Sequence, residues 1–93
     1  MMDEIKELIH KYEGKICELD EEYISLTSSN DIGALRPIDC YLEVSYLPES
    51  DKYRMSCYEK SCTVLGGVGG TFSKYEIMNE VKLQLKRYNF RRK

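Results

Sequence analysis

Seven apolar residues near the N-terminus repeat at alternating intervals of four and three, which is a heptad pattern. Side chains at this spacing share one face of an α-helix, and another surface has to cover that face. The pattern predicts one long amphipathic helix over residues 3–27. Gly14 falls at the outermost heptad position, so it lowers helix propensity by about 1 kcal/mol without interrupting the seam. The seven seam residues are Ile5, Ile9, Tyr12, Ile16, Leu19, Tyr23 and Leu26.

Two surfaces can cover this seam. The helix can pack on the remainder of its own chain, or it can pair with a second copy in a homo-oligomer. A dimer is favoured because isoleucine occupies two a positions of the heptad and leucine two d positions. The hydroxyls of Tyr12 and Tyr23 need a partner or a route to water, which suits a wider and wetter interface than a strict zipper. The seven seam residues are therefore the predicted oligomer interface.

A hairpin is predicted after a linker at residues 28–39, which are rich in Ser, Asn, Asp, Gly and Pro. A loop over residues 48–51 pairs Tyr46 with Tyr53 and Leu42 with Cys57, and this register places the apolar residues on one face. A third strand is expected over residues 62–65, with a bulged continuation of the second strand as the alternative. The hairpin or meander then covers about residues 40–65.

The other face of this hairpin is polar and rich in tyrosine, which is common in this chain, with eight residues in 93. It offers a rigid amphipathic surface to a macromolecular partner, although ordinary cross-strand stabilisation explains the same residues. The predicted partner-binding residues are Tyr41, Glu43, Arg54 and Tyr58.

A second helix is predicted over residues 74–89. Ser73 and Glu76 have the spacing of a capping box, and Phe72 and Ile77 that of a hydrophobic staple. Its apolar stripe consists of Met78, Val81, Leu85 and Tyr88.

A glycine-rich loop over residues 66–71 leads into this helix. It is interpreted as a flexible connection, with a small-anion or nucleotide site at the helix N-terminus as the alternative. The spacing matches neither a P-loop nor a dinucleotide-binding motif. The residues of that weak site are Gly66, Gly67, Gly69, Gly70, Thr71 and Ser73.

The two ends of the chain carry opposite charge. Residues 1–31 hold nine acids and three lysines, a balance of −6, whereas residues 82–93 hold six bases and no acid. The basic end interleaves cations with aromatic residues, as single-stranded nucleic-acid binders do, but the acidic first segment makes nucleic acid an unfavoured partner. Bases that offset a helix C-terminus are the ordinary interpretation. The weak nucleic-acid candidates are Lys86, Arg87, Arg91, Arg92 and Lys93, and the basic tail is placed at residues 90–93.

No constellation of residues predicts an enzyme, a cofactor or a metal site. His10 is the single histidine and is expected on a solvated helix face. The four cysteines lack the paired spacing of a zinc site. There is no secretory signal and no apolar run of membrane-spanning length, so we expect a cytoplasmic protein with reduced thiols. The four cysteines are Cys17, Cys40, Cys57 and Cys62.

The predicted fold is a single α+β domain over residues 1–93, with the element order α-β-β-(β)-α. The leading functional hypothesis is a small non-enzymatic protein that self-associates through its first helix and binds another macromolecule, as an adaptor or inhibitor from a bacterial or phage accessory genome would. The alternatives are an anion or nucleotide binder that uses the glycine loop, and a nucleic-acid binder that uses the basic tail.

Overall fold

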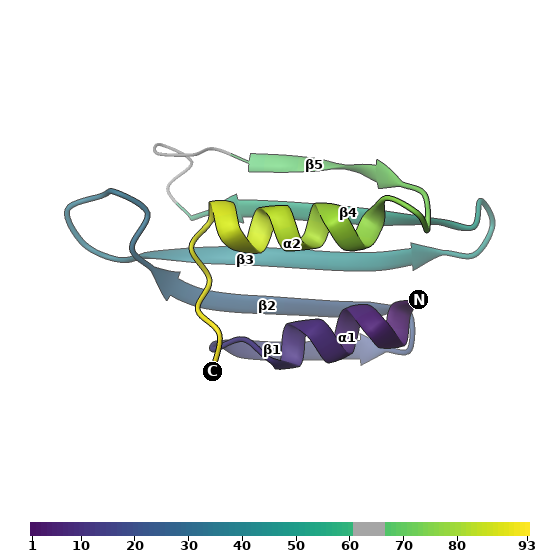
Figure 1. Ribbon diagram of the computed structural model, residues 1–93, viewed down its shortest axis with the longest axis horizontal. Coiled ribbons are helices and arrows are strands. Elements are labelled where there is room, and N and C mark those ends of the chain that lie inside the picture. The colour runs from purple at the N-terminus through teal and green to yellow at the C-terminus, as the bar shows by residue number, and fades with distance from the viewer. Residues whose placement is uncertain (61–66) are drawn as a thin grey trace.

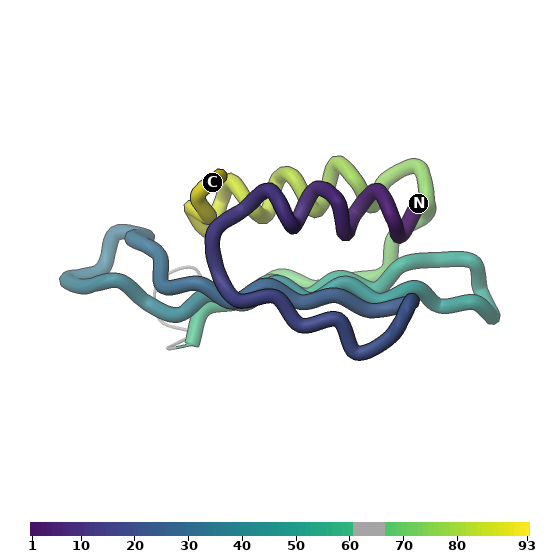
Figure 2. The backbone as a smooth tube through the Cα atoms, turned by 90° about the horizontal axis from the view of Figure 1, so that it is seen from below, coloured from purple at the N-terminus to yellow at the C-terminus, as the bar shows by residue number. Residues whose placement is uncertain are grey.

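The computed structural model describes residues 1–60 and 67–93. Its described strands form one antiparallel sheet of five, in which neighbours in sequence are also neighbours in space. Both helices lie on the same face of this sheet and run in the same direction (Figure 1 and Figure 2). The elements are α1 (Met2–His10), β1 (Lys15–Asp20), β2 (Tyr23–Asn30), β3 (Ile38–Leu47), β4 (Lys52–Glu59), β5 (Gly67–Phe72) and α2 (Ile77–Arg87).

The α+β class is confirmed, but the long N-terminal helix is wrong. The helix α1 ends at His10, and the chain then turns at Gly14 into β1. Gly14 has φ +132°, and a Cβ built there would lie 2.6 Å from the carbonyl oxygen of Thr27. Only glycine fits such a turn, because other residues rarely adopt this φ and their side chain would strike the neighbouring strand.

The later part of the predicted helix forms strands instead. In β2 the buried residues repeat at every second position and not at every third or fourth. In β2, Ile24 and Leu26 are fully buried while the residues between and around them are half-buried. Alternation at every second residue is the pattern of a strand with one face on the core. Asp20 closes the preceding turn, where its Oδ1 accepts a 2.7 Å hydrogen bond from the Glu22 amide.

The seven seam residues therefore do not share a surface. Ile5 and Ile9 of α1 and Leu26 of β2 are buried in the core, whereas Leu19 of β1 is 73% exposed. Tyr23 lies on the opposite face of β2 from Leu26, since the two are three residues apart on one strand. A helical oligomer seam is thus ruled out, and self-association itself stays a prediction.

The core lies between the sheet and the helix layer. Asn30 reaches into it and donates a 2.9 Å hydrogen bond from Nδ2 to the carbonyl oxygen of Tyr88, which fastens the end of α2 to the sheet. The principal buried apolar residues are Ile5, Ile9, Ile24, Leu26, Cys40, Leu42, Val44, Tyr53, Met55, Cys57, Ile77, Val81, Leu85, Tyr88 and Phe90.

The central hairpin has the predicted register. Tyr46 pairs with Tyr53, Val44 with Met55 and Leu42 with Cys57. The predicted linker is shorter than expected, because β2 extends to Asn30 and β3 begins at Ile38. The proposed third strand over residues 62–65 lies outside the described residues.

The glycine-rich segment is the edge strand β5 and not a loop. Gly67 pairs with Tyr58 and Phe72 with Tyr53, so the strand continues the sheet beyond β4. The two- or three-stranded meander is thereby corrected to five strands.

The apolar stripe of the second helix was predicted correctly, but the residues at which the helix begins and ends were not. Val81, Leu85 and Tyr88 are buried and Met78 is half-buried. The regular helix begins at Ile77, after a turn in which the Ile77 amide bonds the carbonyl oxygen of Ser73 at 3.0 Å. It ends at Arg87 and not at residue 89. Among the described residues, no helix has the length and apolar character to cross a membrane.

Candidate functional site

One face of the sheet is left uncovered by the helices, and it is called the open face below. Figure 2 shows both helices on the other side, and no helix or strand of residues 1–60 and 67–93 covers the open face. Strand pairing arranges its side chains in three rows across β2, β3 and β4. The rows are Thr27–Tyr41–Tyr58, Ser25–Glu43–Ser56 and Tyr23–Ser45–Arg54.

A carboxylate held by tyrosines occupies the middle of this face. The Tyr58 hydroxyl donates to Oε2 of Glu43 at 2.7 Å, and the Tyr23 hydroxyl donates to Oε1 at 3.5 Å. The hydrogen bond to Glu43 raises the pKa of Tyr58 to about 12, so this tyrosine remains a donor at neutral pH. Glu43 is on the central strand, and its carboxylate is oriented by the short hydrogen bond from Tyr58 on β4, with a longer contact to Tyr23 on β2.

Stacking fixes the tyrosines as well. The rings of Tyr41 and Tyr58 lie 5.0 Å apart between centroids and are inclined by 17°. Gly67 pairs with Tyr58 on its other side and Gly69 pairs with Ser56, so the open face is bare backbone over much of β5. The two stacked rings on β3 and β4 thus lie beside a strand that presents few side chains on this face.

The structure brings together all four residues predicted to bind a partner: Tyr41, Glu43, Arg54 and Tyr58. Sequence reasoning missed Tyr23, because the heptad pattern had assigned it to a helix. Arg54 is exposed and lines a hollow of about 410 Å³ beside the β3–β4 turn. Among the described residues it forms no salt bridge with Glu43. Glu43 therefore keeps its charge available on the open face.

The glycine segment is not the loop before the second helix in which an anion site was predicted, and anion binding there stays a prediction. Strand β5 contains Gly67, Gly69, Gly70 and Thr71, while Gly66 lies outside the described residues. The Ser73 amide, which would face an anion, instead donates to Oε1 of Glu76 at 3.1 Å. This hydrogen bond lowers the pKa of Glu76, and its carboxylate occupies the place that the anion was expected to take.

The basic end of the chain pairs with residues 11–13, which follow the first helix. The Glu13 amide bonds the carbonyl oxygen of Arg91 at 2.7 Å, and the Lys93 amide bonds that of Lys11 at 2.9 Å. Lys86 and Arg92 line a cleft between the helices, while Arg87 lies over the ring of Tyr88. Nucleic-acid binding by this end stays a prediction.

His10 is on α1 and Cys17 on β1, whereas Cys40 and Cys57 are diagonal neighbours on the core face of β3 and β4. His10 is exposed and its Nε2 lies 3.0 Å from Oε1 of Glu18. Burial raises the pKa of Cys40 to about 11 and that of Cys57 to about 12, so both thiols are protonated at neutral pH. Cys17 is exposed, and Cys62 lies outside the described residues. Within the described part of the chain, no three His, Cys, Asp or Glu side chains gather as metal ligands would.

Of the predicted sites, the open face is the one whose residues the fold assembles into a single ordered surface. Glu43, Tyr41 and Tyr58 come from adjacent strands, and their contacts with one another are direct. Comparison of the chain with protein-family models, with curated proteins and with solved structures found no match.

Proposed function

We propose that this chain is a small non-enzymatic binding protein whose open face binds a protein partner that presents a basic side chain to Glu43. The observation that carries the proposal is the fixed carboxylate of Glu43, held between Tyr23 and Tyr58 on a sheet face that no described element covers. A lysine or arginine placed there gains an ion pair and lies against tyrosine rings, which attract cations.

The composition of the face supports a protein as the partner. Tyrosine and serine are the residues that antibody binding sites favour, because tyrosine contributes a large amphipathic contact at low cost in side-chain entropy. Here the stacking of Tyr41 on Tyr58 and the hydrogen bonds to Glu43 remove part of that cost before binding. Such a surface suits an adaptor or an inhibitor.

A different protein fits the open face better than a second copy of this chain. In a symmetric pair of open faces, the two copies of Glu43 would approach each other because this residue lies in the middle of the face. Two like charges in a desolvated interface are strongly unfavourable. The complementary surface is therefore expected to be basic.

Photo-crosslinking tests this proposal. A benzophenone amino acid at Ser56 lies on the open face beside Glu43, and one at Asn79 lies on the helix layer as the control. In extracts of the cells that make this protein, we expect a specific crosslinked protein from position 56 and not from position 79. Adding Glu43→Gln to the position-56 variant is expected to abolish that product, whereas Glu7→Gln, an equal change of charge on α1, leaves it intact.

Two outcomes contradict the proposal. One is equal crosslinking of the same proteins from positions 56 and 79. The other is a product from position 56 that survives Glu43→Gln unchanged, because the carboxylate would then have no part in recognition.

Self-association is also proposed, through a surface other than the heptad seam. The edge strand β5 contains no charged residue and no proline, and edge strands without such features pair readily with other strands. Two copies can join β5 to β5 about a two-fold axis and continue the sheet.

Thr71→Lys is expected to abolish this dimer, because a charge on an edge strand opposes further pairing. Light scattering at several tens of micromolar is the measurement, with Ser50→Lys in the exposed β3–β4 turn as the control. We expect a dimer for the unaltered chain and the control, and a monomer for Thr71→Lys. A monomer in all three, or a dimer that Thr71→Lys leaves intact, contradicts pairing through β5.

A further inference from the structure

We propose that the cleft between α1 and α2, called the helix cleft below, binds a small organic anion with an apolar group, such as an aryl phosphate. The cleft lies on the side of the sheet opposite the open face, so this proposal is independent of the proposed function. Its volume is about 430 Å³, within the range of pockets that hold small molecules. Its principal lining residues are Leu8, Tyr12, Lys82, Lys86, Phe90 and Arg92.

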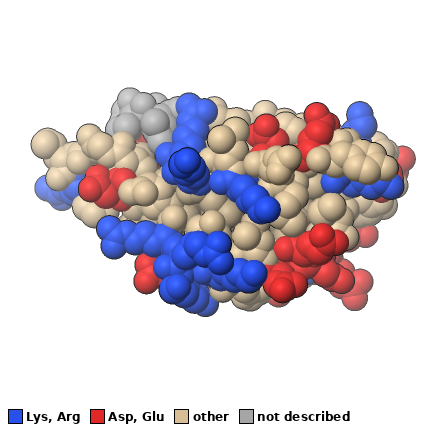
Figure 3. All heavy atoms as spheres, in the orientation of Figure 1, with Lys and Arg blue, Asp and Glu red and all other residues tan. Residues whose placement is uncertain are grey.

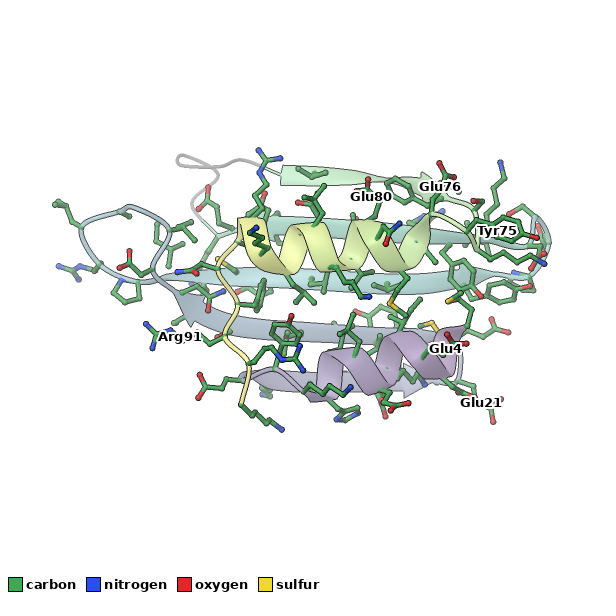
Figure 4. All side chains as sticks on the ribbon, in the orientation of Figure 1. Glu4, Glu21, Tyr75, Glu76, Glu80 and Arg91 are labelled. Carbon is green, nitrogen blue, oxygen red and sulfur yellow. The ribbon has the colours of Figure 1, made fainter. Side chains whose placement is uncertain are left out.

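The charge of the lining selects an anion. Lys82, Lys86 and Arg92 line the helix cleft, and no carboxylate side chain of the described residues does. Among residues 1–60 and 67–93, none of these three cations forms a salt bridge. Figure 3 shows most of the bases over the left and centre of the molecule and a smaller group at its right end, and Figure 4 places Glu4 and Glu21 at the right, away from Arg91.

Helix dipoles account for part of this segregation but not for all of it. Both helices end near the cations that line the helix cleft. Each helix C-terminus is equivalent to roughly −0.5 of an elementary charge. The bases of residues 82–93 contribute +6 with no acid among them. The dipoles therefore leave most of that positive charge uncompensated, and a bound anion would relieve the repulsion among the bases.

The wall of the helix cleft that carries Arg92 is held in place by the rest of the chain. Its guanidinium lies 5.7 Å from the ring centroid of Tyr12, and the two residues form an isolated β-bridge. Asn89 has φ +55° and donates a 2.7 Å hydrogen bond from Nδ2 to the carbonyl oxygen of Asp31. The tail is thus tied to Tyr12 on the α1 side of the cleft and to the connection that follows β2.

Apart from Asn89, the rest of the lining consists of apolar and aromatic residues, and we expect the ligand to carry a matching apolar group. Leu8 and Tyr12 are half-buried, and Phe90 is almost fully buried. An inorganic ion could use the cations but would leave the exposed parts of Leu8 and Tyr12 facing water. A phosphate or similar group on an aromatic ring would satisfy both parts of the lining, with the anion against the lysines and the ring against Leu8 and Tyr12.

Calorimetry with 1-naphthyl phosphate tests this site. We expect binding that the double substitution Lys82→Gln and Lys86→Gln weakens by at least about tenfold, as loss of charge-assisted contacts implies. The control is Lys74→Gln with Lys52→Gln, which removes the same charge from exposed positions that do not line the helix cleft. It is expected to change the affinity by less than about twofold, because only screened long-range attraction is lost. Inorganic phosphate and neutral 1-naphthol are each expected to bind at least about tenfold more weakly.

Amide chemical shifts of the full chain locate the bound probe. Shifts at Tyr12, Asn89 and Phe90 support the helix cleft, and shifts confined to the open face overturn it. Equal weakening by the two pairs of substitutions, or equal affinity for phosphate and 1-naphthyl phosphate, also overturns the proposal. The proposal is also overturned if 1-naphthyl phosphate does not bind at millimolar concentration. This holds even if a single-stranded oligonucleotide binds the same lysines.

Discussion

Leu26→Ala is expected to lower the free energy of unfolding by about 2–5 kcal/mol, whereas Leu19→Ala changes it by less than about 0.5 kcal/mol. The two leucines hold equivalent places in the heptad pattern, so a seam helix would lose comparable stability from either substitution. In the structure Leu26 is fully buried between β2 and the helix layer, and Leu19 on β1 is 73% exposed. Removing the Leu26 side chain loses its burial and leaves a cavity, while removing that of Leu19 does neither.

Urea unfolding followed by circular dichroism measures both changes. The slopes of the unfolding transitions should match that of the unaltered chain, so that a shift of midpoint reports stability alone. Comparable losses from the two substitutions would contradict the placement of residues 15–30 in β1 and β2.

Gly14→Ala is expected to destabilise the chain by at least about 2 kcal/mol. The backbone at Gly14 has φ +132°, and the added Cβ would lie 2.6 Å from the carbonyl oxygen of Thr27 and 2.9 Å from Cδ1 of Leu26. Relief requires movement of the β2 backbone. On an exposed helix position the same substitution would instead stabilise the chain by about 1 kcal/mol. The sign of the effect therefore distinguishes a turn from a helix at this position.

Gly33→Ala is the matched control. Gly33 also has positive φ, at +96°, but nothing lies within 4 Å of its added Cβ. Its substitution adds backbone strain without a collision, so a smaller loss of about 1 kcal/mol is expected. Thermal unfolding of both variants is sufficient to compare them, and a rise in Tm for Gly14→Ala would contradict the turn.

The part of the fold that could be predicted is the part whose signals are local. In the β3–β4 hairpin, alternation and a short loop specify the same register, and Tyr46 pairs with Tyr53 as expected. Before it, spacings of three and four happened to join residues of one helix and two strands. The alternation of Ile24 and Leu26 was present, but the longer heptad pattern outweighed it in a chain where Gly14 could be read either as a poor helix residue or as a turn.

The residues of the candidate site were likewise predicted where a local pattern placed them and missed where none did. Tyr41, Glu43, Arg54 and Tyr58 follow from the register of one hairpin, and the fold does bring them together. Tyr23 was missed because it was assigned to the seam helix, whereas its place beside Glu43 depends on the pairing of β2 with β3. Strand β5 was missed because its glycines lack the side chains from which strands are recognised.

The most direct test of binding at the open face is the Kd for the protein that crosslinks from position 56, measured by calorimetry with Glu43→Gln and Glu7→Gln. Glutamine keeps the shape of Glu43 and removes its charge, so we expect a Kd at least about tenfold higher if a basic side chain binds there. Glu7→Gln is expected to leave the Kd within about twofold, because that carboxylate lies on the helix layer, away from the interface. A Kd that Glu43→Gln does not change, or that Glu7→Gln raises as much, would contradict recognition through the carboxylate of the open face.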